Sequence, residues 1–139
     1  MDFDKMVFDM RRQGFKCAQI MAKVALVIDG KENPDLLRAM SGLNTGMAET
    51  GGACGVLTGG AVALGYFTGH GEPDELPHDR AMEIVAAYVN WFRETYKTDT
   101  CYGLINGDFS NCPSVCPGVI QAGYEKMIDL LLEYEIFES

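Results

Sequence analysis

The sequence predicts an all-α protein, a single-domain bundle of five or six helices that spans residues 1–139. Apolar residues recur three and four positions apart through most of the chain, which is the period of an amphipathic helix. No segment keeps the strict alternation of a half-buried strand, and no internal repeat or low-complexity tract is present. A chain of 139 residues is long enough to bury one self-supporting core.

Three helices are expected in the first part of the chain. Helical spacing covers residues 3–13 and, after Gly14, residues 15–28. A short third helix restarts at Asn33 and Pro34, because Asn caps a helix and Pro fits its first position.

The central stretch, residues 50–71, contains no Lys, Arg, Asp or Glu and is long enough to span a bilayer. We favour a buried helix over residues 53–68. No basic residue occurs between Ala39 and Asp79 to anchor a membrane helix, and eight glycines lower both the hydrophobicity and the helix propensity of the stretch.

Two further helices complete the bundle. The clearest pattern covers residues 77–97, where a second apolar stripe indicates burial on two sides or contact with a second copy, so a homodimer is one expectation. The last helix begins between Pro113 and Pro117, because Pro is tolerated in a first turn, and runs to about Phe137. A short turn is expected over residues 102–105.

The chain is acidic, with a formal charge of −9 and a pI near 4.5. This balance disfavours nucleic acid and anionic membrane surfaces, both of which require clustered Lys and Arg. A basic protein partner or a neutral small molecule remains compatible with it. The first residues do not form a secretory signal, so a cytoplasmic location is expected, and there sets of cysteines usually serve metal binding or catalysis.

The five cysteines fall within about one turn of the predicted helix starts, and their odd number rules out complete internal pairing. They are Cys17, Cys54, Cys101, Cys112 and Cys116. A helix N-terminus carries partial positive charge and free N–H groups, which favour the thiolate and predict lowered thiol pKa values. The competing interpretation is that these are buried structural cysteines, since free cysteine is among the most buried residue types.

The spacing of the cysteines excludes several familiar sites. The chain has no Cys-x-x-Cys, so thioredoxin-type, zinc-ribbon and covalent-haem motifs are absent, and Cys112 and Cys116 form its closest pair. Four dispersed cysteines that meet at one end of a bundle can still hold an iron–sulfur cluster. They can equally form one or two redox disulfides.

Four cysteine-containing segments carry a resemblance to a known family. They read Gly-Phe-Lys-Cys17-Ala-Gln, Gly52-Ala-Cys-Gly-Val-Leu-Thr-Gly59, Thr100-Cys-Tyr-Gly-Leu and Cys116-Pro-Gly-Val-Ile. In order and context they resemble the C_GCAxxG_C_C family, small proteins named for their cysteines and associated with redox activity. The resemblance covers residues 14–130. The middle motif departs from the family name, because Ala53-Cys54-Gly55 stands where Gly-Cys-Ala is expected.

The resemblance implies a helical fold, electron or thiol chemistry, and four functional cysteines. These are Cys17, Cys54, Cys101 and Cys116, either as metal ligands or as the catalytic thiols of disulfide chemistry. Cys112 is then an extra cysteine, or a substitute for Cys116. Proteins related to the family include cytochrome-associated modules with iron–sulfur clusters, which favours a cluster by analogy.

Other candidate sites are weaker. His70 and His78 flank a turn-rich loop and are interpreted as surface or capping residues rather than as a metal pair. The acids of the same loop lack calcium-loop spacing. The glycines of residues 51–60 do not form a phosphate loop, because no Lys follows them.

Three functions therefore stay open from the sequence. The first is a small redox or electron-transfer protein in which the four cysteines bind an iron–sulfur cluster or another soft metal. The second is a thiol–disulfide oxidoreductase or redox sensor that uses the same cysteines, and the third is a non-catalytic helical interaction module. The sequence does not decide whether the protein is an enzyme, and its redox partner, expected to be basic, is not identified.

Overall fold

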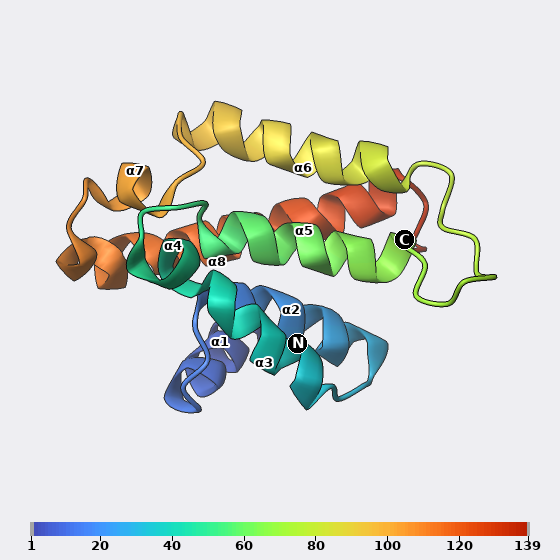
Figure 1. The fold of residues 1–139 in the computed structure, drawn as a ribbon, viewed down its shortest axis with the longest axis horizontal. Coiled ribbons are helices and arrows are strands. Elements are labelled where there is room, and N and C mark those ends of the chain that lie inside the picture. Colours follow the sequence, from blue (N-terminus) through green and yellow to red (C-terminus); the bar gives the residue numbers. More distant parts are fainter. Residues whose placement is uncertain (1, 139) are drawn as a thin grey trace.

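The computed structural model describes residues 2–138, and this part of the chain is helical and contains no β-strand (Figure 1). The elements are α1 (Phe3–Arg12), α2 (Cys17–Asp29), α3 (Pro34–Met40), η1 (Ser41–Leu43), α4 (Asn44–Glu49), α5 (Gly55–Thr68), α6 (Ala81–Tyr96), α7 (Cys101–Ile105), η2 (Phe109–Asn111) and α8 (Cys112–Glu133). The all-α prediction is confirmed. Seven right-handed α-helices replace the expected five or six, because the short turn over residues 102–105 is a complete helix, α7.

Helix α5 forms the centre of the bundle and packs against α2, α6 and α8 (Figure 1). Gly59 lets α2 approach, since a Cβ atom at this position would lie 2.7 Å from the Ala18 carbonyl oxygen. On the opposite side the hydroxyl of Tyr88 donates a 2.8 Å hydrogen bond to the Val56 carbonyl. The uncharged stretch of the sequence is therefore a core helix, and within residues 2–138 no helix combines the length and apolar character needed to cross a membrane.

Helix α6 is buried on one stripe rather than equally on two. Ile84 and Tyr88, from one predicted stripe, are fully buried, whereas Met82, from the other, is 85% exposed; within Met82's stripe Phe92 is fully buried. Val89, from the same stripe as Met82, packs only partly against the core. A homodimer through this face stays a prediction.

Three of the long helices run in the same direction. In Figure 1, α2, α5 and α8 all begin at the left-hand end of the molecule and run to the right, whereas α6 runs back. Each helix N-terminus carries about half a positive charge, so three such termini meet at one end.

The segment labelled α4, at the same end, is a left-handed turn. Thr45, Gly46, Met47 and Ala48 all have φ between 55° and 64°, and Glu49 has φ of 66°. Only Gly46 adopts this conformation without a Cβ penalty, and the other residues each cost about 1–2 kcal/mol. Backbone strain of this kind persists where the surroundings over-determine it, and it is concentrated at functional sites.

Candidate functional site

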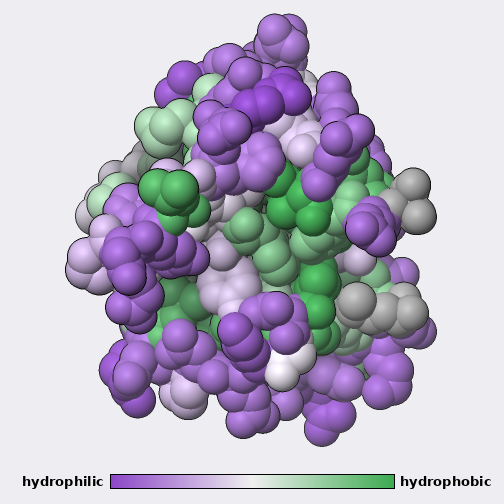
Figure 2. Space-filling model, turned by 90° about the vertical axis from the view of Figure 1, so that its right-hand side faces the viewer, coloured by the Kyte–Doolittle hydropathy of each residue, from purple (hydrophilic) through white to green (hydrophobic). Residues whose placement is uncertain are grey.

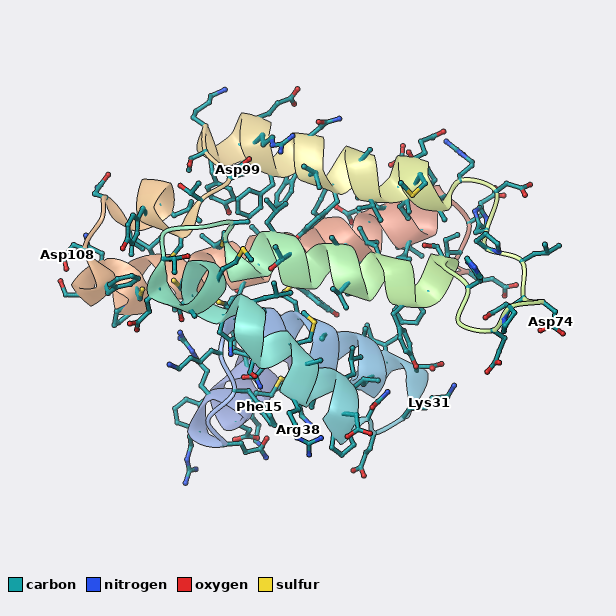
Figure 3. All side chains as sticks on the ribbon, in the orientation of Figure 1. Phe15, Lys31, Arg38, Asp74, Asp99 and Asp108 are labelled. Atoms are coloured by element: carbon teal, nitrogen blue, oxygen red, sulfur yellow. The ribbon has the colours of Figure 1, made fainter. Side chains whose placement is uncertain are left out.

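A cavity of about 290 Å³ opens at the end where α2, α5 and α8 begin, and all five cysteines line it. The sulfur atoms gathered around α4, α7 and the start of α8 are visible at the left of Figure 3. The remaining wall is mainly apolar, formed by Phe15, Val56, Leu104, Ile105, Phe109 and Val119. The structure thus brings together the four cysteines singled out from the sequence, together with the one set aside as an extra.

Cys54 and Cys101 are held side by side by a short backbone pairing between distant parts of the chain. Ala53 and Thr100 form an isolated antiparallel bridge. The Cys54 N–H donates to the Asp99 carbonyl at 2.8 Å, and the Cys101 N–H donates to the Gly52 carbonyl at 2.8 Å. Side chains next to a bridge pair point to the same face, so both thiols face the cavity.

Cys17 is the first residue of α2, and its thiol packs directly on the backbone at the start of α5. A Cβ atom at Gly55 would lie 2.3 Å from the Cys17 sulfur, so alanine at this position would require the Cys17 side chain or the helix backbone to shift. The Thr45 N–H, in the left-handed turn, donates to the Cys17 sulfur at 3.4 Å.

The N-terminus of α2 is capped by a residue from another element. The buried side chain of Asn44 accepts the N–H groups of Ala18 at 3.1 Å and Gln19 at 3.4 Å. Its amide group in turn donates to the Gln19 side chain at 2.9 Å. The free N–H groups that the sequence argument assigned to a Cys17 thiolate are thus taken by Asn44.

Cys112 and Cys116 lie one turn apart at the start of α8, where both line the cavity. Burial raises the pKa of Cys116, and the proximity of the Cys112 thiol adds to this shift. Cys112 is therefore a neighbour of the other thiols in space and not a peripheral residue.

The expectation that helix starts lower the thiol pKa values is wrong for three of the five cysteines. Burial raises the pKa of Cys54 to about 12, and it raises the pKa of Cys116 to about 12. Burial also raises the pKa of Cys101, with smaller contributions from Cys112, Cys17 and Glu49. For these three thiolates the free-energy cost of desolvation exceeds the stabilisation that the helix N-termini provide.

Cys54 shows this competition directly. The N–H groups of Val56 and Leu57, in the first turn of α5, donate to the Cys54 sulfur and lower its pKa. Desolvation has the larger effect and the opposite sign, and the neighbouring thiols Cys17 and Cys101 add to it. Cys54, Cys101 and Cys116 are therefore protonated at neutral pH, and a bound cation would offset the repulsion among their thiolates.

Within residues 2–138 no three Cys, His, Asp or Glu side chains lie close enough together to hold a single metal ion, and all five cysteines are free thiols. The two histidines lie in the exposed loop between α5 and α6. His78 accepts a hydrogen bond from the Arg80 N–H at 3.1 Å, which fits the capping role expected from the sequence.

Comparison with models of known protein families gives a match for this chain. A family model described as "Putative redox-active protein (C_GCAxxG_C_C)" matches residues 15–130, which include every cysteine. The chain belongs to this family. The C_GCAxxG_C_C resemblance stated from the sequence is thereby confirmed. No curated protein and no solved structure is detectably similar to the chain.

The C_GCAxxG_C_C cavity also contains residues that sequence reasoning missed. Arg11, Lys16, Thr45 and Glu49 supply its polar wall, and Arg11 and Lys16 give the mouth two cations against the single carboxylate of Glu49. Of these four, only Lys16 stands in a cysteine-containing segment, next to Cys17, and that position was the one signal in the sequence.

Proposed function

We propose that this C_GCAxxG_C_C protein is a small redox or electron-transfer protein in which Cys17, Cys54, Cys101 and Cys116 bind an iron–sulfur cluster or another soft metal. The observation that carries the proposal is a hollow of about 290 Å³ surrounded by thiols from separate elements of the fold. A pair of cysteines suffices for a disulfide, whereas a cluster requires several thiolates around a shared space.

The donor set fits such a group. The cavity offers five sulfur donors, and its lining contains one carboxylate and no histidine, a composition that suits soft metals rather than Mg²⁺ or Ca²⁺. A cluster bound here would supply one-electron chemistry.

The protein's own residues would tune that chemistry in three ways. The apolar wall, including Phe15 and Phe109, excludes water. The N–H of Thr45 donates to the Cys17 sulfur, and the first turn of α5 donates to the Cys54 sulfur. Hydrogen bonds to the sulfurs and solvent exclusion are the main influences of a protein on a cluster potential, and the helix N-termini favour the negative charge of a thiolate-ligated cluster.

Anaerobic reconstitution with ferrous iron and sulfide tests the proposal. We expect iron and sulfide to bind together, with thiolate-to-iron absorption in the visible range. Serine in place of Cys17, Cys54, Cys101 or Cys116 should abolish binding, whereas Cys112→Ser, the matched control, should retain it. A colourless protein without iron after oxygen-free, iron-replete preparation would overturn the proposal.

The close pair of Cys112 and Cys116, one turn apart on α8 and both lining the cavity, favours a second candidate function, a thiol–disulfide oxidoreductase or redox sensor. Two thiols one helical turn apart are within reach of the Cα separation of a disulfide. Titration with dithiothreitol should then show a reversible change of two thiols in metal-free protein. An unchanged count of free thiols would exclude it.

A further inference from the structure

The mouth of the cysteine cavity has the opposite charge balance from the rest of the chain. The protein carries 20 acids and 11 bases, yet the cavity is lined by Arg11, Lys16 and a single acid, Glu49. Arg11 and Lys16 are exposed at the mouth, and within residues 2–138 neither takes part in an ion pair. Arg11 and Lys16 are therefore available to bind an anionic group on a molecule that enters the cavity.

Cys112 lines the cavity and is the thiol that the proposed cluster leaves free. It is only partly buried, like Cys17 and Cys116, whereas Cys54 and Cys101 are buried. Arg11 lies next to the start of α8, since it also lines a second groove with Pro117 and Gly118. Arg11 and Cys112 thus both line the cavity on the side where α8 begins.

We propose that this cavity admits small organic disulfides that carry a carboxylate or sulfonate, and that the Cys112 sulfur attacks them. The inference rests on the proposed function in one respect: once the other four cysteines bind a cluster, Cys112 is the free thiol that remains. The volume of about 290 Å³ limits the disulfide to a small one, and in the cluster-loaded protein only the part of the cavity that the cluster leaves free would be open to it.

The chemical step is thiol–disulfide exchange. The Cys112 thiolate attacks one sulfur of the disulfide, a bond forms between Cys112 and that sulfur, and the original sulfur–sulfur bond breaks. The second sulfur leaves as a thiolate and takes up the proton that Cys112 released. The products are one mixed disulfide and one free thiol, so atoms and electrons balance without a further oxidant.

Arg11 and Lys16 act as positioning residues for the anionic group of the disulfide. The apolar wall, with Phe15 and Phe109, accommodates its carbon chain. At physiological ionic strength charges beyond about 8 Å are screened, so the two cations at the mouth outweigh the distant acids that make the net charge −9.

The test compares dithiodipropionate with cystamine, an anionic and a cationic disulfide of similar length. The rate of mixed-disulfide formation at Cys112 is followed by mass spectrometry in both metal-free and iron–sulfide-reconstituted protein. We expect dithiodipropionate to react faster, the reverse of what the net charge of −9 alone predicts. Substituting both cations, Arg11→Gln with Lys16→Gln, should reduce the dithiodipropionate rate about five- to tenfold and leave the cystamine rate unchanged or higher.

Arg12→Gln provides the matched control, because Arg12 is the next residue of the same helix but does not line the cavity. It should change the dithiodipropionate rate less than twofold by the same screening argument. A faster reaction with cystamine, an unchanged rate after substitution of both cations, or labelling of another cysteine in the loaded protein would overturn the inference. Iron and sulfide content tests the proposed function. The preference of metal-free protein for the anionic disulfide tests the further inference, and its outcome does not depend on cluster binding.

Discussion

The two ends of the bundle are built by the same helices in opposite ways. At the cysteine end α2, α5 and α8 begin, and at the other end they finish, next to the loop of residues 69–80 (Figure 1). Figure 2 looks onto that second end, where hydrophilic side chains surround a smaller apolar area. In Figure 3, Asp74 marks this loop and Asp108 marks the cysteine end.

The loop end is held mainly by local contacts in water. The Glu75 carboxylate accepts the N–H groups of Gly71 and Glu72, which lowers its pKa, and Leu76 is 89% exposed. At the cysteine end the contacts join distant parts of the chain, and the strained turn of α4 is included in them. The difference indicates that the cysteine end is the part of the molecule whose geometry is fixed at an energetic cost, as expected of a functional site.

The largest expected contrast between the two ends is in thiol reactivity. A thiol introduced by Leu76→Cys at the exposed loop serves as an internal reference for Cys54. Because burial raises the pKa of Cys54 to about 12, its alkylation at pH 8 should be about a thousandfold slower than that of the reference thiol.

The pH dependence of the two rates should also differ. The reference rate should level off near pH 9, once that thiol is ionised, whereas the Cys54 rate should keep rising about tenfold per pH unit. Iodoacetamide labelling of metal-free protein, followed by peptide mass spectrometry, measures both rates. Equal rates at pH 8 would show that the Cys54 thiol is accessible and ionised, contrary to its position in the structure.

The next contrast lies within α5, whose two ends contain glycines in different surroundings. Gly55→Ala would place a Cβ atom against the Cys17 sulfur and should cost about 1–3 kcal/mol of unfolding free energy. Gly65→Ala has no atom within 4 Å to meet and should gain about 0.5–1 kcal/mol from helix propensity. Denaturant unfolding of both variants measures the difference, and a stabilising Gly55→Ala would refute the close packing of α2 on α5.

Two asparagine caps provide a third comparison. Asn44→Ala leaves the buried N–H groups of Ala18 and Gln19 without an acceptor and should destabilise the protein by about 2 kcal/mol. Asn33→Ala removes an exposed cap that accepts only the local N–H of Leu36. It should lower the unfolding free energy by about 1 kcal/mol. Thermal unfolding distinguishes the two, and equal costs would mean that Asn44 acts only as a local cap.

The sequence was sufficient for the helices but not for the site they surround. Periodicity placed every long helix, and the prediction that the cysteines lie within about one turn of helix starts is confirmed, since α2, α7 and α8 begin at Cys17, Cys101 and Cys112. The position of a cysteine at a helix start does not tell how deeply its thiol is buried, so the pKa shifts of Cys54, Cys101 and Cys116 were predicted with the wrong sign. The left-handed turn was also missed, because apart from Gly46 its residues have no preference for positive φ.

The smallest expected effect on stability is at this left-handed turn, where replacing alanine by glycine should stabilise the protein instead of destabilising it. Ala48 is exposed and has φ of 62° and ψ of 46°, a conformation that penalises its Cβ atom. Ala48→Gly should therefore stabilise the protein by about 0.5–1 kcal/mol, because the relief of steric strain exceeds the added entropy of the unfolded chain. Differential scanning calorimetry of the metal-free protein measures the shift.

Ala86→Gly is the matched substitution in a right-handed helix, since Ala86 is exposed in the middle of α6. It should destabilise the protein by about 1 kcal/mol, so the same chemical change has opposite signs at the two positions. If Ala48→Gly destabilised as much as Ala86→Gly, the left-handed turn would not be strained. Stabilisation by Ala48→Gly together with loss of cluster binding would instead show that the strain serves the site, because a relaxed turn no longer holds the Thr45 N–H against the Cys17 sulfur.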